Sequence, residues 1–328
     1  MRQPRAKTGT RVGRQPSVLE ERKAAPLATT NGAGPAGDRL GVRKTYKLYI
    51  GGQFPRTESG RAYEVFDARG RPLANACRAT RKDIRDAVRA ARTALPEWSA
   101  KTAFNRSQVL YRIAELMEGR RDQFVAEVIT AEGVGRRRAT RLVDAAIDRW
   151  VWYAGWADKF TQVIGTVNPV AGSYFNFSVP EPTGVVGIIA PEGSSLLGLV
   201  SRLAPAIVSG NCAVVIASES RPLPAVTLTE VLATSDVPGG VVNLITGLRR
   251  ELVQHLAGHM DVNALDAYGL DPAQGAGIEE LAVENVKRLV RPPSGGADAI
   301  DWLSDRAQSP YLIGEFTETK TVWHPIGS

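Results

Sequence analysis

The sequence predicts an α/β protein built around a doubly wound parallel sheet, with a protruding β-hairpin arm. Three short apolar runs separated by helical stretches support this prediction: VVGIIA at 185–190, AVVIA at 213–217 and VVNLI at 241–245. Strands of a parallel sheet are buried on both faces, so they consist of near-continuous apolar residues, and the intervening helices cover those faces. The helical stretches that can do so span about 195–209 and 223–235.

The residues that precede these three runs are predicted to form two pairs of short strands followed by four helices. The strand pairs turn at Gly51-Gly52 and around Gly70. Thr80, followed three positions later by Asp83, is typical of a reciprocally capped helix N-terminus. This pattern places the first helix immediately after the second strand pair.

The fourth helix, at 138–160, contains three of the six tryptophans. An aromatic cluster of this kind is either a platform on which a ligand stacks or part of the hydrophobic core. Leu142, Ala146 and Trp150 recur on one helical face, and large aromatic side chains dominate packing energetics. The sequence therefore favours a packing role for these tryptophans.

Two further β segments are predicted. Residues 161–182 carry Gly and Pro at turn positions between β-prone residues, which indicates a hairpin of two or three strands. The segment FTETKTVWHP at 316–325 has strong β-propensity. We therefore expect one domain over 45–296, which includes the hairpin, and a linker with a C-terminal strand over 297–328. Residues 297–310 fit either a helix or a linker.

The basic character of the chain is confined to residues 1–44. This segment holds ten Lys and Arg against three Asp and Glu, which accounts for the whole formal net charge of +7. It is rich in Pro, Gly, Thr and Ala and lacks the apolar clusters that offset ordering entropy, so it is predicted to be disordered. No aromatic residue interleaves its arginines, which makes nucleic acid an unfavoured partner.

The composition excludes several classes of protein. No apolar run approaches the ~18 to 20 residues of a membrane helix, and no signal-type segment is present, so a cytoplasmic protein is expected. Cys77 and Cys212 are too few for a disulfide framework and lack the spacing of a zinc or redox motif. No acidic residue falls between His255 and His259 as in a zinc protease, and His324 stands alone, so no metal is expected.

Several segments resemble the aldehyde dehydrogenase superfamily in both order and spacing. The matching segments are Tyr49–Phe54, Pro182–Ser195, Leu203–Pro222, Val237–Gly247 and Phe316–Pro325. Together they extend the resemblance over about 46–296 and again over about 310–326. The resemblance implies that the predicted sheet is the family's nucleotide-binding domain and that the closing strand adds to a neighbouring subunit's sheet.

The resemblance also implies a chemistry whose residues this chain lacks. The family oxidises aldehydes with a cysteine thiolate, an asparagine that completes the oxyanion hole, a glutamate base and a nicotinamide cofactor. Pro292 stands at the glutamate of the family's Glu-Leu-Gly-Gly motif, and Gly193 stands at the asparagine. The second domain that would follow Gly296 and carry the nucleophile has no counterpart, and Cys77 and Cys212 are expected to be packing residues.

A cofactor, NAD or NADP, would lie at the carboxyl ends of the parallel strands. By resemblance, the cofactor-binding residues are Pro191, Ser218, Glu219, Gly247 and Gly269. Two departures weaken this expectation, because the family's lysine at the end of the second strand is Ile216 and the hydroxyl of its Phe-Thr-Gly-Ser turn is replaced by Leu270.

The favoured hypothesis is a non-catalytic structural or regulatory subunit. It would assemble with itself or with a complete aldehyde dehydrogenase through the hairpin and the closing strand, whose edge is otherwise open. One alternative is NAD(P)-dependent aldehyde oxidoreductase activity that is weak or completed by a partner subunit. A third hypothesis makes the basic tail a tether to nucleic acid or a membrane.

Overall fold

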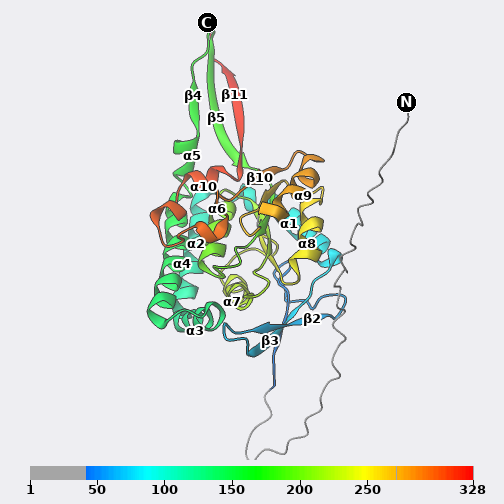
Figure 1. Ribbon diagram of the computed structural model, residues 1–328. Helices are drawn as coiled ribbons and strands as arrows, with labels where there is room; N and C mark the ends of the chain where they lie inside the picture. The colour runs from blue at the N-terminus through cyan, green and yellow to red at the C-terminus, as the bar shows by residue number, and fades with distance from the viewer. Residues whose placement is uncertain (1–41, 271, 328) are drawn as a thin grey trace, which may run out of the picture. The chain divides into compact units, whose positions relative to one another are not determined.

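A computed structural model describes residues 42–270 and 272–327 (Figure 1). From Arg43 onward the chain forms one compact unit that contains three β-sheets. Up to residue 41, the predicted basic tail lies outside the described residues.

The central sheet has five parallel strands in the order β10–β9–β6–β7–β8. Their bounds are Val185–Ile189 for β6, Cys212–Ile216 for β7, Val242–Ile245 for β8, Ala264–Asp266 for β9 and Arg288–Val290 for β10. Every residue of β6 and β7 is buried, as strands covered on both faces require. The predicted parallel sheet is confirmed. Its strand order reverses between β6 and β9, where ligands of such sheets bind beyond the carboxyl ends.

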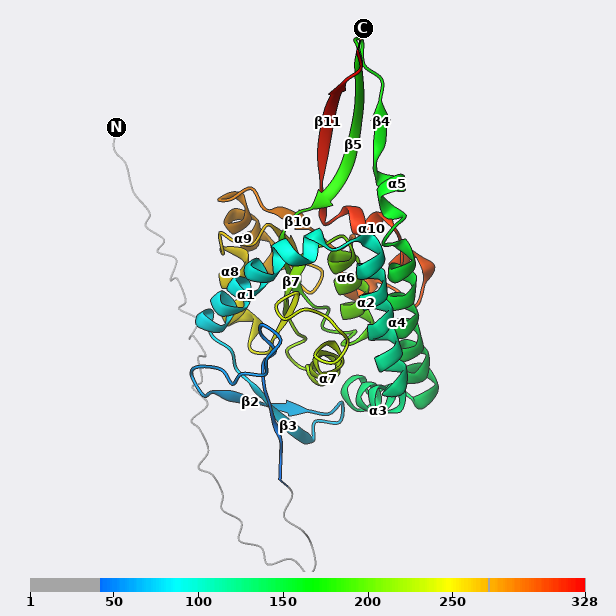
Figure 2. The same cartoon turned by 180° about the vertical axis from the view of Figure 1, so that it is seen from behind.

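Helices cover both faces of this sheet (Figures 1 and 2). On one face α1 and α8 pack against the strands, and on the other α6 and α7 do so, backed by α2, α3 and α4. The bounds are Arg81–Ala100 for α1, Ala103–Gly119 for α2, Arg121–Glu132 for α3, Arg136–Trp156 for α4, Leu197–Val208 for α6, Leu223–Leu232 for α7, Arg249–Ala257 for α8 and Pro272–Val283 for α9. Trp150 and Tyr153 of α4 are fully buried, as the packing interpretation predicts.

A three-stranded sheet forms the N-terminal edge of the unit. Strands β2 (Ala62–Phe66) and β3 (Pro72–Cys77) form the predicted antiparallel pair around Gly70, and β1 (Thr45–Tyr46) pairs with β3 in parallel. The first predicted strand pair forms in part. Ile50 bridges to Gln53 across the Gly51-Gly52 turn and the Leu48 amide donates to the Pro55 carbonyl, while Tyr49 bridges to Leu244 at the edge of the central sheet.

Strands β4 (Thr166–Asn168), β5 (Tyr174–Pro182) and β11 (Thr317–Pro325) form a separate antiparallel sheet, here called the arm sheet, in the order β11–β5–β4. It extends away from the helices in Figures 1 and 2. The predicted hairpin begins later than expected, because Phe160–Ile164 forms a short helix, α5. The closing strand β11 pairs along nine residues with β5 of its own chain.

Residues 291–316, here called the connector, join β10 to β11. They contain two 3₁₀ turns, Ala297–Ala299 and Asp305–Ala307, and the four-residue helix α10 (Tyr311–Gly314). Ile313 and Phe316 are fully buried, so the connector is packed against the body of the unit.

We predict that Asp83→Ala destabilises the chain by about 2 kcal/mol, because it removes a buried carboxylate that holds together the start of α1. Asp83 accepts hydrogen bonds from Thr57 Oγ1 at 2.7 Å and from the Thr80 amide at 2.7 Å. The control is Asp86→Ala in the same helix, whose partner Arg85 is exposed. Urea denaturation compares the two variants, and equal losses of stability would contradict the assignment.

Candidate functional site

The carboxyl ends of the central strands surround a cleft of about 490 Å³, here called the edge cleft. Two of the expected cofactor-binding residues, Glu219 and Gly269, line it. The other three, Pro191, Ser218 and Gly247, belong to the same loops without lining the cleft. The remaining lining residues are Glu192, Ser220, Arg249, Arg250, Tyr268, Leu270, Gly295, Gly296, Ala297 and Asp298.

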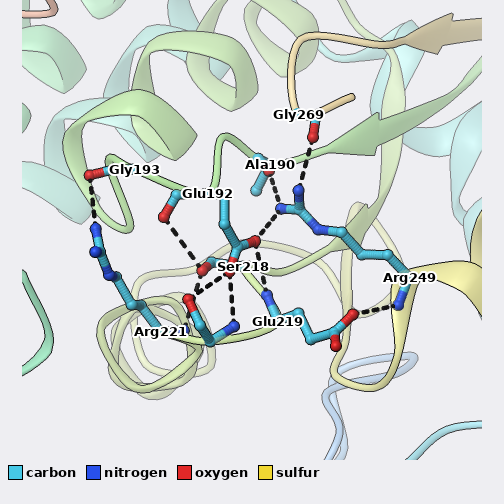
Figure 3. Close-up of polar contacts among 9 residues, drawn as sticks. Ala190, Glu192, Gly193, Ser218, Glu219, Arg221, Arg249 and Gly269 are labelled. Atoms are coloured by element: carbon cyan, nitrogen blue, oxygen red, sulfur yellow. Dashed lines mark hydrogen bonds and ion pairs between the residues drawn. The ribbon is translucent and has the colours of Figure 1, made fainter. Parts of the chain in front are cut away.

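Arg249, the first residue of α8, occupies the inner end of the edge cleft (Figure 3). Its guanidinium donates to the carbonyls of Gly269, at 2.7 Å, and Ala190, and forms a 2.8 Å ion pair with Glu192. Burial lowers the pKa of Arg249, while Glu192 and Glu219 oppose that shift. The guanidinium thus ties together the loops after β6, β8 and β9.

Glu192 organises the loop after β7. Its carboxylate accepts hydrogen bonds from the amides of Glu219, at 3.0 Å, and Ser220, at 2.7 Å, and from Ser220 Oγ at 2.5 Å. Burial opposes ionisation of Glu192, but the Arg249 charge and these hydrogen bonds outweigh burial and lower its pKa. Glu192 is therefore an ionised carboxylate that is fully engaged by the protein itself.

Glu219, which the sequence analysis expects to contact a cofactor, also has a partner within the chain. Its Oε2 accepts the backbone amide of Arg249 at 2.7 Å, and it thereby caps the N-terminus of α8. Gly269 has a structural explanation too, since a Cβ there would lie 2.2 Å from the Ala190 carbonyl oxygen. Close packing of two backbone segments is sufficient reason for a glycine at that position.

Gly193 lies directly against the connector. A Cβ added at Gly193 would lie 2.8 Å from Asp298 Oδ1, closer than real Cβ contacts. A side chain at this position therefore requires the exposed Asp298 carboxylate to turn aside. Arg221 donates a 3.2 Å hydrogen bond to the Gly193 carbonyl, which further fixes the loop.

Pro292 lies just after β10 and lines a second, mainly apolar pocket of about 300 Å³. Leu270, Ile278 and Leu289 contribute to the same wall. Proline has neither a side-chain acid nor an amide hydrogen, so this position has no group that can take up a proton.

The two thiols are remote from nucleophilic chemistry. Cys77 and Cys212 are both buried and unpaired. Burial raises the pKa of Cys212 to about 12, so its thiol stays protonated at neutral pH. The burial of both residues agrees with the packing role expected from the sequence.

Two buried arginines hold the connector over the carboxyl edge. Arg202 of α6 forms 2.6 Å ion pairs with Asp266 at the end of β9 and with Glu315 of the connector. Burial disfavours the charge on Arg202, but Asp266 and Glu315 outweigh it and raise its pKa. Arg149 of α4 donates to the Trp302 carbonyl at 2.5 Å. None of these contacts is predictable from the sequence, because they join segments far apart in the chain.

Within residues 42–270 and 272–327, no group of three or more His, Cys, Asp and Glu side chains is arranged to hold a metal ion. Among the same residues, no helix is both long and apolar enough to span a bilayer. His255 lies in the last turn of α8, and His259 Nδ1 accepts the Asp261 amide at 3.1 Å.

We predict that Glu192→Gln lowers the free energy of unfolding by about 1 kcal/mol at neutral pH, a value discounted for the partial exposure of this carboxylate. The folded pKa lies below the unfolded value of 4.5, so the stabilisation is present above that pH and is lost as the pH falls through the folded pKa. Urea denaturation at about pH 7 and about pH 3 should show the difference from the parent shrinking in acid. A difference independent of pH would contradict the ion pair.

Comparison with known proteins places these features in a family. A family model described as aldehyde dehydrogenase matches residues 55–300. The chain is 33% identical over 273 residues to aldehyde dehydrogenase family 2 member B4 of Arabidopsis thaliana, covering 82% of this chain and 48% of that protein. It is 30% identical over 259 residues to the D-glyceraldehyde dehydrogenase (NADP(+)) of Picrophilus torridus, covering 78% and 52%.

Solved structures of aldehyde dehydrogenases are similar to this chain in fold. The NAD+ complex of an aldehyde dehydrogenase from Bacillus cereus is similar, with a TM-score of 0.70, 27% identity and coverage of 75% of this chain and 50% of that one. HpcC from Thermus thermophilus has a TM-score of 0.71, 30% identity and coverage of 75% and 47%. The chain spans about half the length of the curated relatives it matches. From the family match and these likenesses, the chain belongs to the aldehyde dehydrogenase family.

Proposed function

We propose that the chain is a non-catalytic member of the aldehyde dehydrogenase family, a structural or regulatory subunit that assembles with itself or with a complete aldehyde dehydrogenase. In this proposal residues 45–296 are the family's NAD-binding domain, and 297–328 are a linker and an assembly strand. The observation that carries the proposal is the burial of Cys77 and Cys212, which leaves neither thiol accessible to an aldehyde.

The chemistry of aldehyde oxidation supports this assignment. The reaction needs a thiolate nucleophile, a donor for the oxyanion and a base that activates water. Neither cysteine of the chain is accessible, and Gly193 and Pro292 carry no side chain that can donate or accept a proton. Loss of one oxyanion donor alone typically costs ~10²- to 10³-fold in rate. An isolated chain is therefore expected to have no aldehyde dehydrogenase activity.

The arm sheet supports the assembly part of the proposal. Directly paired residues of antiparallel strands lie on the same face, so the register places Val167, Phe177 and Val322 together. Phe175, whose ring lies 5.4 Å from that of Phe177, shares this face. Val167 is 69% exposed and Phe175 is 45% exposed. An apolar sheet face of this kind is typical of a protein–protein contact.

We predict that the double variant Val167→Asp, Phe175→Asp weakens assembly by about tenfold or more, because charge replaces exposed apolar surface that a partner would bury. The matched control is Thr166→Asp, one residue away on the opposite face of β4 and likewise exposed. The measurements are sedimentation of the chain alone and its recovery with tagged full-length aldehyde dehydrogenases of the same cell. A parent chain that is monomeric at micromolar concentration and recovers no such enzyme would refute the assembly proposal.

The second candidate function is NAD(P)-dependent oxidoreductase activity that is weak or completed by a partner subunit. The edge cleft favours it, because this cleft lies at the carboxyl edge of the sheet and retains Glu219 and Gly269. The internal contacts of Glu192 and Glu219 weigh against it, since two carboxylates stand where a dinucleotide would bring its phosphates.

We predict that neither NAD nor NADP saturates the chain below the millimolar range. The reason is that the anion-binding donors of the edge cleft are already engaged by Glu192 and Glu219. The titration is followed by the fluorescence of the six tryptophans. The ring centre of one of them, Trp302, lies 6.3 Å from that of Tyr268, which lines the edge cleft. Saturation at micromolar dinucleotide would favour the second candidate.

A further inference from the structure

The carboxylate of Glu192 sits in a complete set of anion-binding donors. Two consecutive backbone amides, those of Glu219 and Ser220, point to it together with Ser220 Oγ (Figure 3). The Arg249 guanidinium approaches the same carboxylate at 2.8 Å. Consecutive backbone N–H groups, a hydroxyl and an arginine are the donors with which proteins hold phosphate and carboxylate ligands.

Arg249 is held in place beside the cleft independently of Glu192. It is only 8% exposed, and its guanidinium also donates to the carbonyls of Gly269 and Ala190. Because these contacts do not involve Glu192, the positive charge stays at the site without that carboxylate. The guanidinium borders the 490 Å³ edge cleft, which is open to solvent and large enough to admit an anion larger than a carboxylate.

We propose that Glu192 is a tethered anion that fills a built anion site, and that a phosphate group takes its place when the Glu192 side chain is removed. The site comprises the amides of Glu219 and Ser220, the Ser220 hydroxyl and Arg249. This inference is independent of the assembly proposed above, because it concerns only how the edge cleft is filled.

The residues of the edge cleft accordingly do not fit a dinucleotide in the parent chain. Glu192 occupies one set of donors, and Glu219 occupies the N-terminus of α8, at 2.7 Å from the Arg249 amide. A pyrophosphate entering the cleft would meet these two carboxylates, and Asp298 of the connector adds a third. Arg249 and Arg250 also line the cleft, but the three carboxylates outnumber them, so repulsion disfavours the phosphates of a dinucleotide.

The test uses the full chain and two variants of one residue. Glu192→Ala vacates the site, whereas Glu192→Gln removes the charge but keeps the space filled. Inorganic phosphate and ADP are titrated separately into each, with calorimetry and thermal unfolding as readouts. The control is Glu64→Ala, which removes an exposed carboxylate paired with Arg43 in the N-terminal sheet.

We expect phosphate to bind Glu192→Ala at least about tenfold more tightly than it binds the parent, Glu192→Gln or Glu64→Ala. At tenfold excess over the dissociation constant, Tm should rise by about 2 °C. ADP binding tighter than phosphate would show that the ligand's nucleoside also enters the cleft, whereas equal affinities would confine recognition to the phosphate.

Two results would overturn the proposal. One is a Glu192→Ala variant that binds phosphate no better than the parent does. The other is an equal gain in phosphate affinity in Glu192→Gln, because the gain would then come from loss of the negative charge and not from a vacated site. If Glu192→Ala does not fold, Glu192→Ser replaces it, because its short polar side chain also vacates the site, and the same comparison with Glu192→Gln decides.

Discussion

The buried guanidinium of Arg202 is the constraint on which the arrangement of the carboxyl edge depends. It joins α6 to the end of β9 through Asp266 and to the connector through Glu315, each at 2.6 Å. Its planar face lies 3.7 Å from the centre of the Tyr268 ring. Removing Arg202 would leave Asp266 buried without a compensating charge, which typically costs about 3–5 kcal/mol, a large part of the stability of a domain. The ion pair with Glu315 therefore fixes the end of the connector to the body of the unit.

The connector forms part of the surroundings of Gly193 and of the edge cleft, the two regions of interest at the carboxyl edge. Its first 3₁₀ turn brings Asp298 against Gly193, and its preceding glycines form part of the edge cleft. The edge cleft in turn is closed on its inner side by Arg249 and Glu192. The carboxyl edge is thus occupied by the chain's own charged groups, while the arm sheet leaves apolar side chains exposed. This contrast between a carboxyl edge lined by charged groups of the chain and an arm sheet with exposed apolar side chains underlies the proposal of an assembly role.

Local sequence patterns predicted the elements whose causes are local. The apolar runs indicated the three strands, and Thr80 with Asp83 marked the start of α1. Side chains that meet across the fold were not predictable, since Glu192 and Arg249 come from different loops and no periodicity links them. A faint signal did exist: Arg249 and Arg250 begin a helix, where cations are unfavourable unless carboxylates stand nearby. Gly269 was assigned to cofactor binding by resemblance, and its close backbone packing offers an explanation that only the structure reveals.

An assay of aldehyde turnover by the purified chain would decide whether the chain is non-catalytic. The chain is mixed with a simple aldehyde and with NAD or NADP, and formation of the reduced dinucleotide is followed by its absorbance, with no other protein present. We expect no signal above a sample that lacks the chain. Saturable formation that scales with the concentration of the chain would contradict it, because a nucleophile and an oxyanion site would then have to exist at the edge that the connector covers.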